Sequence, residues 1–303
     1  MLERLETRGP SAEQAAGDRS IGAILFFAGK LKADQVVRAL RLQSDEGLRF
    51  GDACIKLGYV TQEDIDSALS QQFHYSYLRP GDTTLDKELV AAYDPFSAQV
   101  EALRDLRTQL LLRWFRTGRR AVELGAERKM LAIVSHDRGD GRTYLAANLA
   151  IVFSQLGGRT LLIDADLRHP RQHSLFNLRN RIGLSSVLAG RANGSAVERV
   201  GNLANLSILP AGAAAPNPLE LLSRPQFRDL LASESKSFDV VLIDTPAAES
   251  SSDAQAIAAR AGGALVVARE DRSRIEALGR LAASIRSTHA QVVGCVLNRF
   301  LRR

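Results

Sequence analysis

The sequence predicts an α/β fold, with a mostly parallel sheet covered by helices on both faces and a small, mainly helical repeat domain before it. Three observations predict this arrangement. Strand-like and helix-like segments alternate from Met130 onward. Several of the strand-like runs are continuous Val, Ile and Leu, as buried parallel strands are. Earlier in the chain, a segment of 24 residues recurs at an offset of 29.

The composition is that of a soluble globular protein, with 45% hydrophobic and 24% charged residues among 303. No apolar run approaches the roughly 18 residues of a membrane-spanning helix, and the N-terminus lacks the apolar core of a signal peptide, so we expect a cytoplasmic protein. The two cysteines, Cys54 and Cys295, predict neither a disulfide framework nor a zinc site. The net charge of +6 suits a nucleotide, an anionic membrane face or a merely solvated surface, and alone it predicts no nucleic-acid binding.

Residues 1–19 are expected to form a disordered lead, followed by a helical repeat domain at 20–78. The two copies are Ser20–Gln43 and Arg49–Gln72. Each predicts a short helix, a turn containing glycine and a second helix. The copies are identical at five aligned pairs: Gly22/Gly51, Gly29/Gly58, Ala39/Ala68, Leu40/Leu69 and Gln43/Gln72.

Residues 79–129 are expected to connect the two domains. Loop-forming prolines flank one short helix-like piece at Lys87–Tyr93. The helical stretch that follows places Glu101, Arg104 and Arg107 three residues apart, so that they share one helix face. Taken alone, this face predicts a solvated surface with local ion pairs.

Residues 130–303 predict a nucleotide-binding domain. The apolar run Met130–Val134 leads into a glycine-containing loop and then a helix-like segment, Thr143–Leu156. Strand, glycine loop and helix are the layout of a P-loop, in which backbone N–H groups and a helix N-terminus face phosphate. Arg142 occupies the position of the usual lysine. The predicted nucleotide contacts are Gly139, Asp140, Gly141, Arg142, Thr143 and Tyr144.

The remaining elements follow from periodicity and from Gly, Pro and Asp at their ends. The expected strands are Met130–Val134, Thr160–Asp164, Leu206–Leu209, Val240–Asp244, Ala264–Ala268 and Val292–Leu297. The expected helices are Thr143–Leu156, Pro218–Leu222, Pro225–Ser233, Ala254–Ala261 and Arg274–Ser287.

Two of these strands end in aspartate, Asp164 and Asp244, and Asp166 follows the first. Ligands of such sheets bind at the carboxyl ends of the strands, where these carboxylates gather. Thr143 Oγ would ligate Mg²⁺ and Asp244 would hold it through water, while Asp164 would complete the metal shell or accept a proton from an attacking hydroxyl. The predicted catalytic residues are Asp164, Asp166 and Arg142, and the predicted metal residues are Thr143, Asp164 and Asp244.

The region Glu101–Asn298 resembles the bacterial tyrosine kinases of polysaccharide export. The motifs that carry the resemblance are Leu161–Arg168, Asp244-Thr245-Pro246, Pro216–Leu222 and the helix face of Glu101, Arg104 and Arg107. The resemblance implies phosphorylation of protein tyrosine with Mg-ATP and regulation of exopolysaccharide chain length. It also implies a membrane-embedded, Wzz-like chain-length-determinant partner, recruitment to the inner membrane face, and homo-oligomerisation through Glu101, Arg104 and Arg107.

The N-terminal repeat resembles the N-terminal domain of type II secretion and pilus-extension ATPases, some of which bind cyclic-di-GMP. This resemblance implies a cyclic-di-GMP site at Gly22, Gln43, Arg49, Gly51 and Gln72, although Ser20 replaces the leading arginine of the first copy. The alternative is a helical docking module without a ligand. With both parts together, the chain resembles the EpsG type of chain-length-determinant kinase.

The chain departs from the kinase family at three places. Arg138 and Arg142 replace the proline and the lysine of the family's loop, and Arg142 is bulkier and planar. The family's C-terminal tyrosine cluster has no counterpart, since the tyrosines are Tyr59, Tyr75, Tyr77, Tyr93 and Tyr144. A non-catalytic scaffold that senses ATP or cyclic-di-GMP is therefore the alternative function. Asp137 occupies the position of the extra lysine of partitioning and cell-division ATPases, which disfavours that class.

Overall fold

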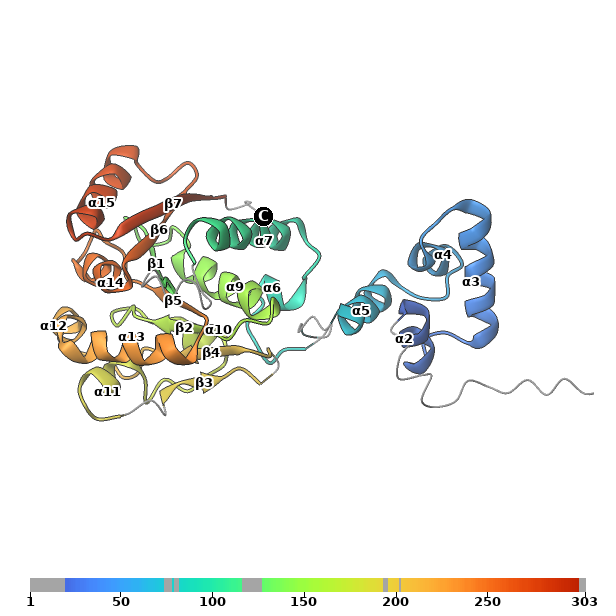
Figure 1. Ribbon diagram of the computed structural model, residues 1–303, viewed down its shortest axis with the longest axis horizontal. Helices are drawn as coiled ribbons and strands as arrows, with labels where there is room; N and C mark the ends of the chain where they lie inside the picture. The colour runs from blue at the N-terminus through green and yellow to red at the C-terminus, as the bar shows by residue number, and fades with distance from the viewer. Residues whose placement is uncertain are drawn as a thin grey trace, which may run out of the picture. The chain divides into compact units, whose positions relative to one another are not determined.

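The computed structural model describes residues 20–73, 78, 82–115, 127–192, 196–201 and 203–299. The expected lead at 1–19, Tyr75, Tyr77 and most of the basic segment before the P-loop strand lie outside these residues. The chain forms two compact units, residues 1–80 and 81–303 (Figure 1).

The first unit consists of two helix pairs related by the repeat. Helices α2 (Ile21–Phe27) and α3 (Ala33–Glu46) are followed by α4 (Phe50–Lys56) and α5 (Gln62–Phe73). The second pair begins 29 residues after the first at both of its helices, the same offset as that of the sequence repeat. Gly29 and Gly58 have φ of +72° and +68°, which explains the glycine in each turn. The core includes Leu25, Leu31, Ala39, Cys54, Val60, Ile65 and Ala68.

The second unit contains a seven-stranded sheet in its described part. The strands are β1 (Met130–Val134), β2 (Thr160–Asp164), β3 (Glu198–Arg199), β4 (Leu206–Leu209), β5 (Val240–Asp244), β6 (Gly263–Arg269) and β7 (Gln291–Asn298). Their order is β3-β4-β2-β5-β1-β6-β7, and every pair is parallel except β3 with β4. The six predicted strands are confirmed. The two-residue edge strand β3 was not predicted.

Helices cover both faces of this sheet, as predicted (Figure 1). They are α6 (Val90–Tyr93), α7 (Ala98–Arg113), α9 (Arg142–Gln155), α10 (Gln172–Leu175), α11 (Leu184–Leu188), α12 (Pro218–Ser223), α13 (Pro225–Ser237), α14 (Asp253–Ala261) and α15 (Ile275–Ser287). One core layer joins the inner side chains of β1, β2 and β5 to α12, α13, α14 and α15. On the other side, α9 packs on β1, β2 and β5, and α6 and α7 pack on α9.

Helix α7, expected in a connector, is a packed part of the second unit. The Phe115 and Phe153 rings meet edge to face with centroids 5.2 Å apart. Arg107 is buried, and its Nη1 donates to the carbonyl of Val152 in α9 at 2.7 Å. Arg107 therefore does not share a solvated face with Glu101 and Arg104, which pair with each other. It occupies a core position between Leu103 and Leu110, where its stem packs and its charged head finds a carbonyl.

Among the described residues, no helix has the length and apolar character needed to cross a membrane.

Candidate nucleotide-binding site

The P-loop joins β1 to α9 and depends on two glycines. Gly139 and Gly141 have φ of +86° and +101°, a region that side chains other than glycine seldom adopt. Gly141 is the N-cap of α9, so the first N–H groups of that helix face the loop. At Gly139 a Cβ atom would also lie 3.0 Å from Arg272 Nη1. The loop is thus shaped as an anion cradle at a helix N-terminus.

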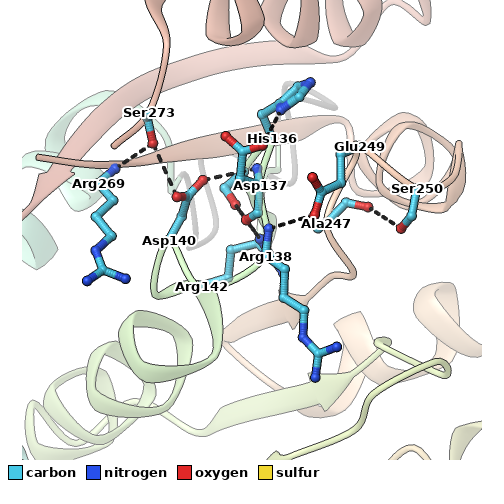
Figure 2. A network of polar contacts seen from close by, with 11 residues as sticks. His136, Asp137, Arg138, Asp140, Arg142, Ala247, Glu249, Ser250, Arg269 and Ser273 are labelled. Carbon is cyan, nitrogen blue, oxygen red and sulfur yellow. Dashed lines mark hydrogen bonds and ion pairs between the residues drawn. The ribbon is translucent and has the colours of Figure 1, made fainter. Parts of the chain in front are cut away.

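Contacts from two other loops hold the P-loop in place (Figure 2). The buried carboxylate of Asp140 accepts from Asp137 N at 3.1 Å and from Ser273 Oγ at 3.2 Å. Arg138 N donates to Glu249 Oε1 at 3.0 Å. The side chain of Asp140 therefore stabilises the conformation of the loop, and it does not line the pocket described below.

The side chain of Arg142 contacts both the P-loop and the segment after β5. Its Nε donates to the carbonyl of Thr245 at 2.9 Å, and its Nη1 donates to the carbonyl of Asp137 at 2.8 Å and to Ser135 Oγ. The residue is only 6% exposed. The guanidinium thereby joins the P-loop to the segment that follows β5.

A pocket of about 450 Å³ opens beside the P-loop. This volume is in the range of small-molecule sites. Among the predicted site residues, Gly139, Gly141, Arg142, Thr143, Tyr144 and Asp166 line it, together with Glu88, Arg138, His169, Pro170 and Arg171. Asp164 and Asp244 are fully buried and do not line it.

Asp164 and Asp244 form a buried carboxylate pair at adjacent strand ends. They are registered partners of β2 and β5. Burial, and then the charge of Asp244, raises the pKa of Asp164 well above its usual value. Burial raises the pKa of Asp244 to about 6, opposed by the nearby charge of Arg142 and by hydrogen bonds from Gln172 and Thr143. Two carboxylates held this close in a dry site favour an added cation.

The residues fit Mg²⁺ at Thr143 and Asp244. Within the described part of the chain, the buried Oδ1 of Asp244 has no hydrogen-bond partner, and the Thr143 hydroxyl lies within hydrogen-bonding reach of the same carboxylate. Oxygen ligands of this kind suit Mg²⁺, which keeps several waters and takes further oxygens from phosphate. Among the described residues, no cluster of three His, Cys, Asp or Glu side chains could hold a metal on its own. Asp164 instead accepts from the N–H groups of Asp166, Arg171 and Gln172.

Gln172 was missed by the sequence analysis. This fully buried side chain donates through Nε2 to Asp244 Oδ2 at 2.9 Å and to the carbonyl of Thr143 at 3.1 Å. It lies in the four-residue helix α10, whose pattern is too short to predict. Glu88 was missed as well, and its Oε1 pairs with Arg171 Nη2 at 2.8 Å across the pocket.

Arg168, from the predicted Asp-x-Asp-x-Arg motif, lies away from the phosphate cradle. Its Nε and Nη2 donate to the two carboxylate oxygens of Asp253 at 2.7 and 3.3 Å. Asp253 begins α14 and its side chain is 1% exposed. This bidentate pair fixes the loop after β2 to the segment after β5, so it supports the site rather than forming it.

Comparison with known proteins gives consistent results. Residues 131–303 match the CobQ/CobB/MinD/ParA nucleotide binding domain family. The chain is 34% identical over 216 residues to a tyrosine-protein kinase, wzc, of Salmonella typhimurium, covering 71% of this chain and 29% of that protein. It is 30% identical over 214 residues to the tyrosine-protein kinase YwqD of Bacillus subtilis, covering 71% of this chain and 86% of that protein.

Among solved structures, the kinase domain of the Escherichia coli tyrosine kinase ETK superimposes with a TM-score of 0.65 at 30% identity, covering 75% of this chain and 85% of that one. The cell division ATPase MinD of Pyrococcus furiosus gives a TM-score of 0.51 at 26% identity, covering 57% of this chain and 72% of that one. The chain spans under a third of the length of the Salmonella relative but most of the Bacillus one.

Proposed function

The chain belongs to the bacterial tyrosine-protein kinases, within the CobQ/CobB/MinD/ParA nucleotide-binding family, and on that basis we propose that it transfers the terminal phosphate of Mg-ATP to protein tyrosine. One observation carries the proposal. A P-loop with Thr143 at its helix N-terminus contacts the buried pair Asp164 and Asp244, and a pocket is lined by Thr143 and by Asp166, whose N–H donates to Asp164.

The residues divide the work of this reaction. The N–H groups of the loop and of the first turn of α9 bind phosphate oxygens. Thr143 and Asp244 would hold Mg²⁺, which would supply positive charge to the phosphate oxygens. The tyrosine oxygen attacks the terminal phosphorus, and the bond from that phosphorus to the oxygen of ADP breaks. Asp166 lines the pocket, whereas Asp164 does not, so Asp166 is better placed to accept the phenolic proton.

The test is incubation with ATP labelled at the terminal phosphate and a tyrosine-containing polypeptide as acceptor, followed by detection of phosphotyrosine. We expect transfer by the wild type that requires magnesium. We expect a loss of at least about 100-fold in Asp166→Asn, because general-base groups contribute on this scale. Nucleotide binding without transfer to any tyrosine would leave the non-catalytic scaffold as the function. Absence of magnesium-dependent nucleotide binding would refute both functions.

The same family membership supports a role in polysaccharide export. We place the protein at the inner face of the membrane, as a homo-oligomer that acts with a Wzz-like chain-length-determinant protein. The relatives include a kinase described as lying in the cps region of Klebsiella pneumoniae. Co-purification with a co-expressed Wzz-like membrane protein tests the association, and failure to co-purify in a mild detergent would contradict it.

In the helical repeat, two explanations compete for the glycines Gly22 and Gly51: a cyclic-di-GMP site, and close packing of the helices. Cβ atoms at Gly22 and Gly51 would lie 3.2 Å from the Phe50 ring and 3.1 Å from Ile65, so close packing alone accounts for both glycines. Arg49 is exposed at the N-cap of α4, where it is free to reach a ligand. Titration with cyclic-di-GMP of the wild type, Arg49→Ala and Gln72→Ala separates the two explanations. Equal binding, or none, would reject this site.

A further inference from the structure

Three arginines line the pocket beside the P-loop in the described part of the chain, and they differ in what they contact. Arg142 is nearly buried and makes three hydrogen bonds to the protein. Arg171 pairs with Glu88. Arg138 is exposed, and its guanidinium has no hydrogen bond or ion pair with any described residue.

The backbone of Arg138 is nevertheless fixed. Its N–H donates to Glu249 Oε1 at 3.0 Å, and the next residue, Gly139, has its carbonyl held by Arg269 Nη1 at 3.2 Å. Figure 2 shows the Arg138 side chain extended away from the loop, with its guanidinium apart from the residues that hold the loop. A guanidinium on a fixed stem at the rim of an anion cradle is a ready donor for phosphate oxygens.

Arg142 is poorly placed for the same task. To turn toward phosphate it must leave the carbonyls of Asp137 and Thr245 and the hydroxyl of Ser135. Two buried carbonyls would then lose a charged donor, which opposes the movement. The charge of Arg142 also stabilises ionised Asp244 where it now lies.

We propose that Arg138 supplies the cation that holds the terminal phosphate of the bound nucleotide, and that Arg142 is a positioning residue that clamps the P-loop to the segment after β5. This inference rests on the proposed nucleotide site. The inference links the two substitutions in this loop, Arg138 for the family's proline and Arg142 for its lysine. Arg142 no longer contacts the terminal phosphate, and Arg138 supplies the positive charge there instead.

The test compares the affinity for Mg-ATP with that for Mg-ADP, measured by calorimetry, because only ATP carries the terminal phosphate. We expect Arg138→Ala to weaken ATP binding about tenfold or more, the scale of a charge-assisted hydrogen bond, with little change for ADP. Arg138→Lys should restore part of the difference. Arg272→Ala is the matched control, since this exposed arginine lies beside Gly139 outside the pocket and should leave the ratio unchanged.

Arg142→Ala should weaken ATP and ADP by similar factors and lower the melting temperature of the nucleotide-free protein, whereas Arg138→Ala should leave that temperature unchanged. The inference is overturned if Arg138→Ala keeps the wild-type ratio of ATP to ADP affinity, or if Arg142→Ala alone loses the preference for ATP. If Arg142→Ala does not fold, the ratio of ATP to ADP affinity in Arg138→Ala and Arg138→Lys still tests the role of Arg138. Wild-type protein that binds neither nucleotide would refute the proposed function itself.

Discussion

Asp164 and Asp244 are registered partners at the ends of the parallel strands β2 and β5, and both side chains are fully buried. Burial, and then the charge of Asp244, raises the pKa of Asp164, and burial raises the pKa of Asp244 as well. The chain thus holds two carboxylates in an arrangement that costs stability until a cation joins them. This is the expected price of a preformed metal-nucleotide site.

Replacement of Asp244 by asparagine should stabilise the metal-free protein at alkaline pH. Because the pKa of Asp244 is raised from 3.8 to about 6, the folded state binds more protons than the unfolded state between these values. Stability therefore falls as the pH rises from about 4 to 6 and stays lowered above it. Urea unfolding in a chelator should show Asp244→Asn gaining up to about 3 kcal/mol over the wild type at pH 8, and less at pH 5.

The same variant should lose the rise in melting temperature that Mg-nucleotide gives the wild type. A stability difference between Asp244→Asn and wild type that is equal at pH 5 and pH 8 would contradict the ionisation argument.

Gln172 should set the affinity for magnesium and nucleotide without touching either. It orients Asp244 and binds the carbonyl of Thr143, so Gln172→Ala leaves both acceptors without this donor. Loss of such a supporting contact costs about tenfold or more in metal affinity. Magnesium titration at fixed nucleotide measures the effect. Gln172→Glu keeps the length of the side chain but adds a carboxylate beside Asp244, so it should bind magnesium more weakly than Gln172→Ala. Equal binding by all three proteins would show that Gln172 is dispensable.

Arg107 should matter for stability and Glu101 for self-association. Arg107→Ala removes a buried hydrogen bond to Val152 and a packed stem, for a loss of about 1–3 kcal/mol in unfolding free energy.

Glu101 is exposed, so Glu101→Arg should change stability by less than about 0.5 kcal/mol. If the exposed part of this face mediates oligomers, Glu101→Arg should reduce the molar mass found by light scattering. An unchanged mass would remove Glu101 from the oligomer interface.

The apolar strands β1, β2, β4, β5 and β6 were predictable because their residues are buried on both faces. The phosphate loop was predictable because its glycines adopt a conformation that few other residues accept. The path of Arg142 was not predictable. Its partner Thr245 lies 103 positions away in sequence and offers a carbonyl, which any residue carries. The burial of Arg107 was not predicted, because a charged residue in a helix pattern indicates an exposed position. Its acceptor, the carbonyl of Val152, is known only from the fold. Gln172 and Glu88 had no local pattern to mark them, since both act through contacts across the fold.

Gly263→Ala should test the packing of the segment before the P-loop strand. A Cβ atom at Gly263, the first residue of β6, would lie 2.3 Å from the Trp114 ring. That ring is nearly buried, its Nε1 donates to the carbonyl of Met130 at 2.9 Å, and Arg128 stacks over it at 4.7 Å. The ring cannot move without breaking these contacts, so we expect urea unfolding to show a loss of about 1–3 kcal/mol in the free energy of unfolding.

Gly279→Ala is the control, because nothing lies within 4 Å of its added methyl group in helix α15. This variant should instead gain about 0.5–1 kcal/mol in the free energy of unfolding. Equal stability of the two variants would mean that Trp114 is not held against β6, and α7 would then lose its anchor to β1.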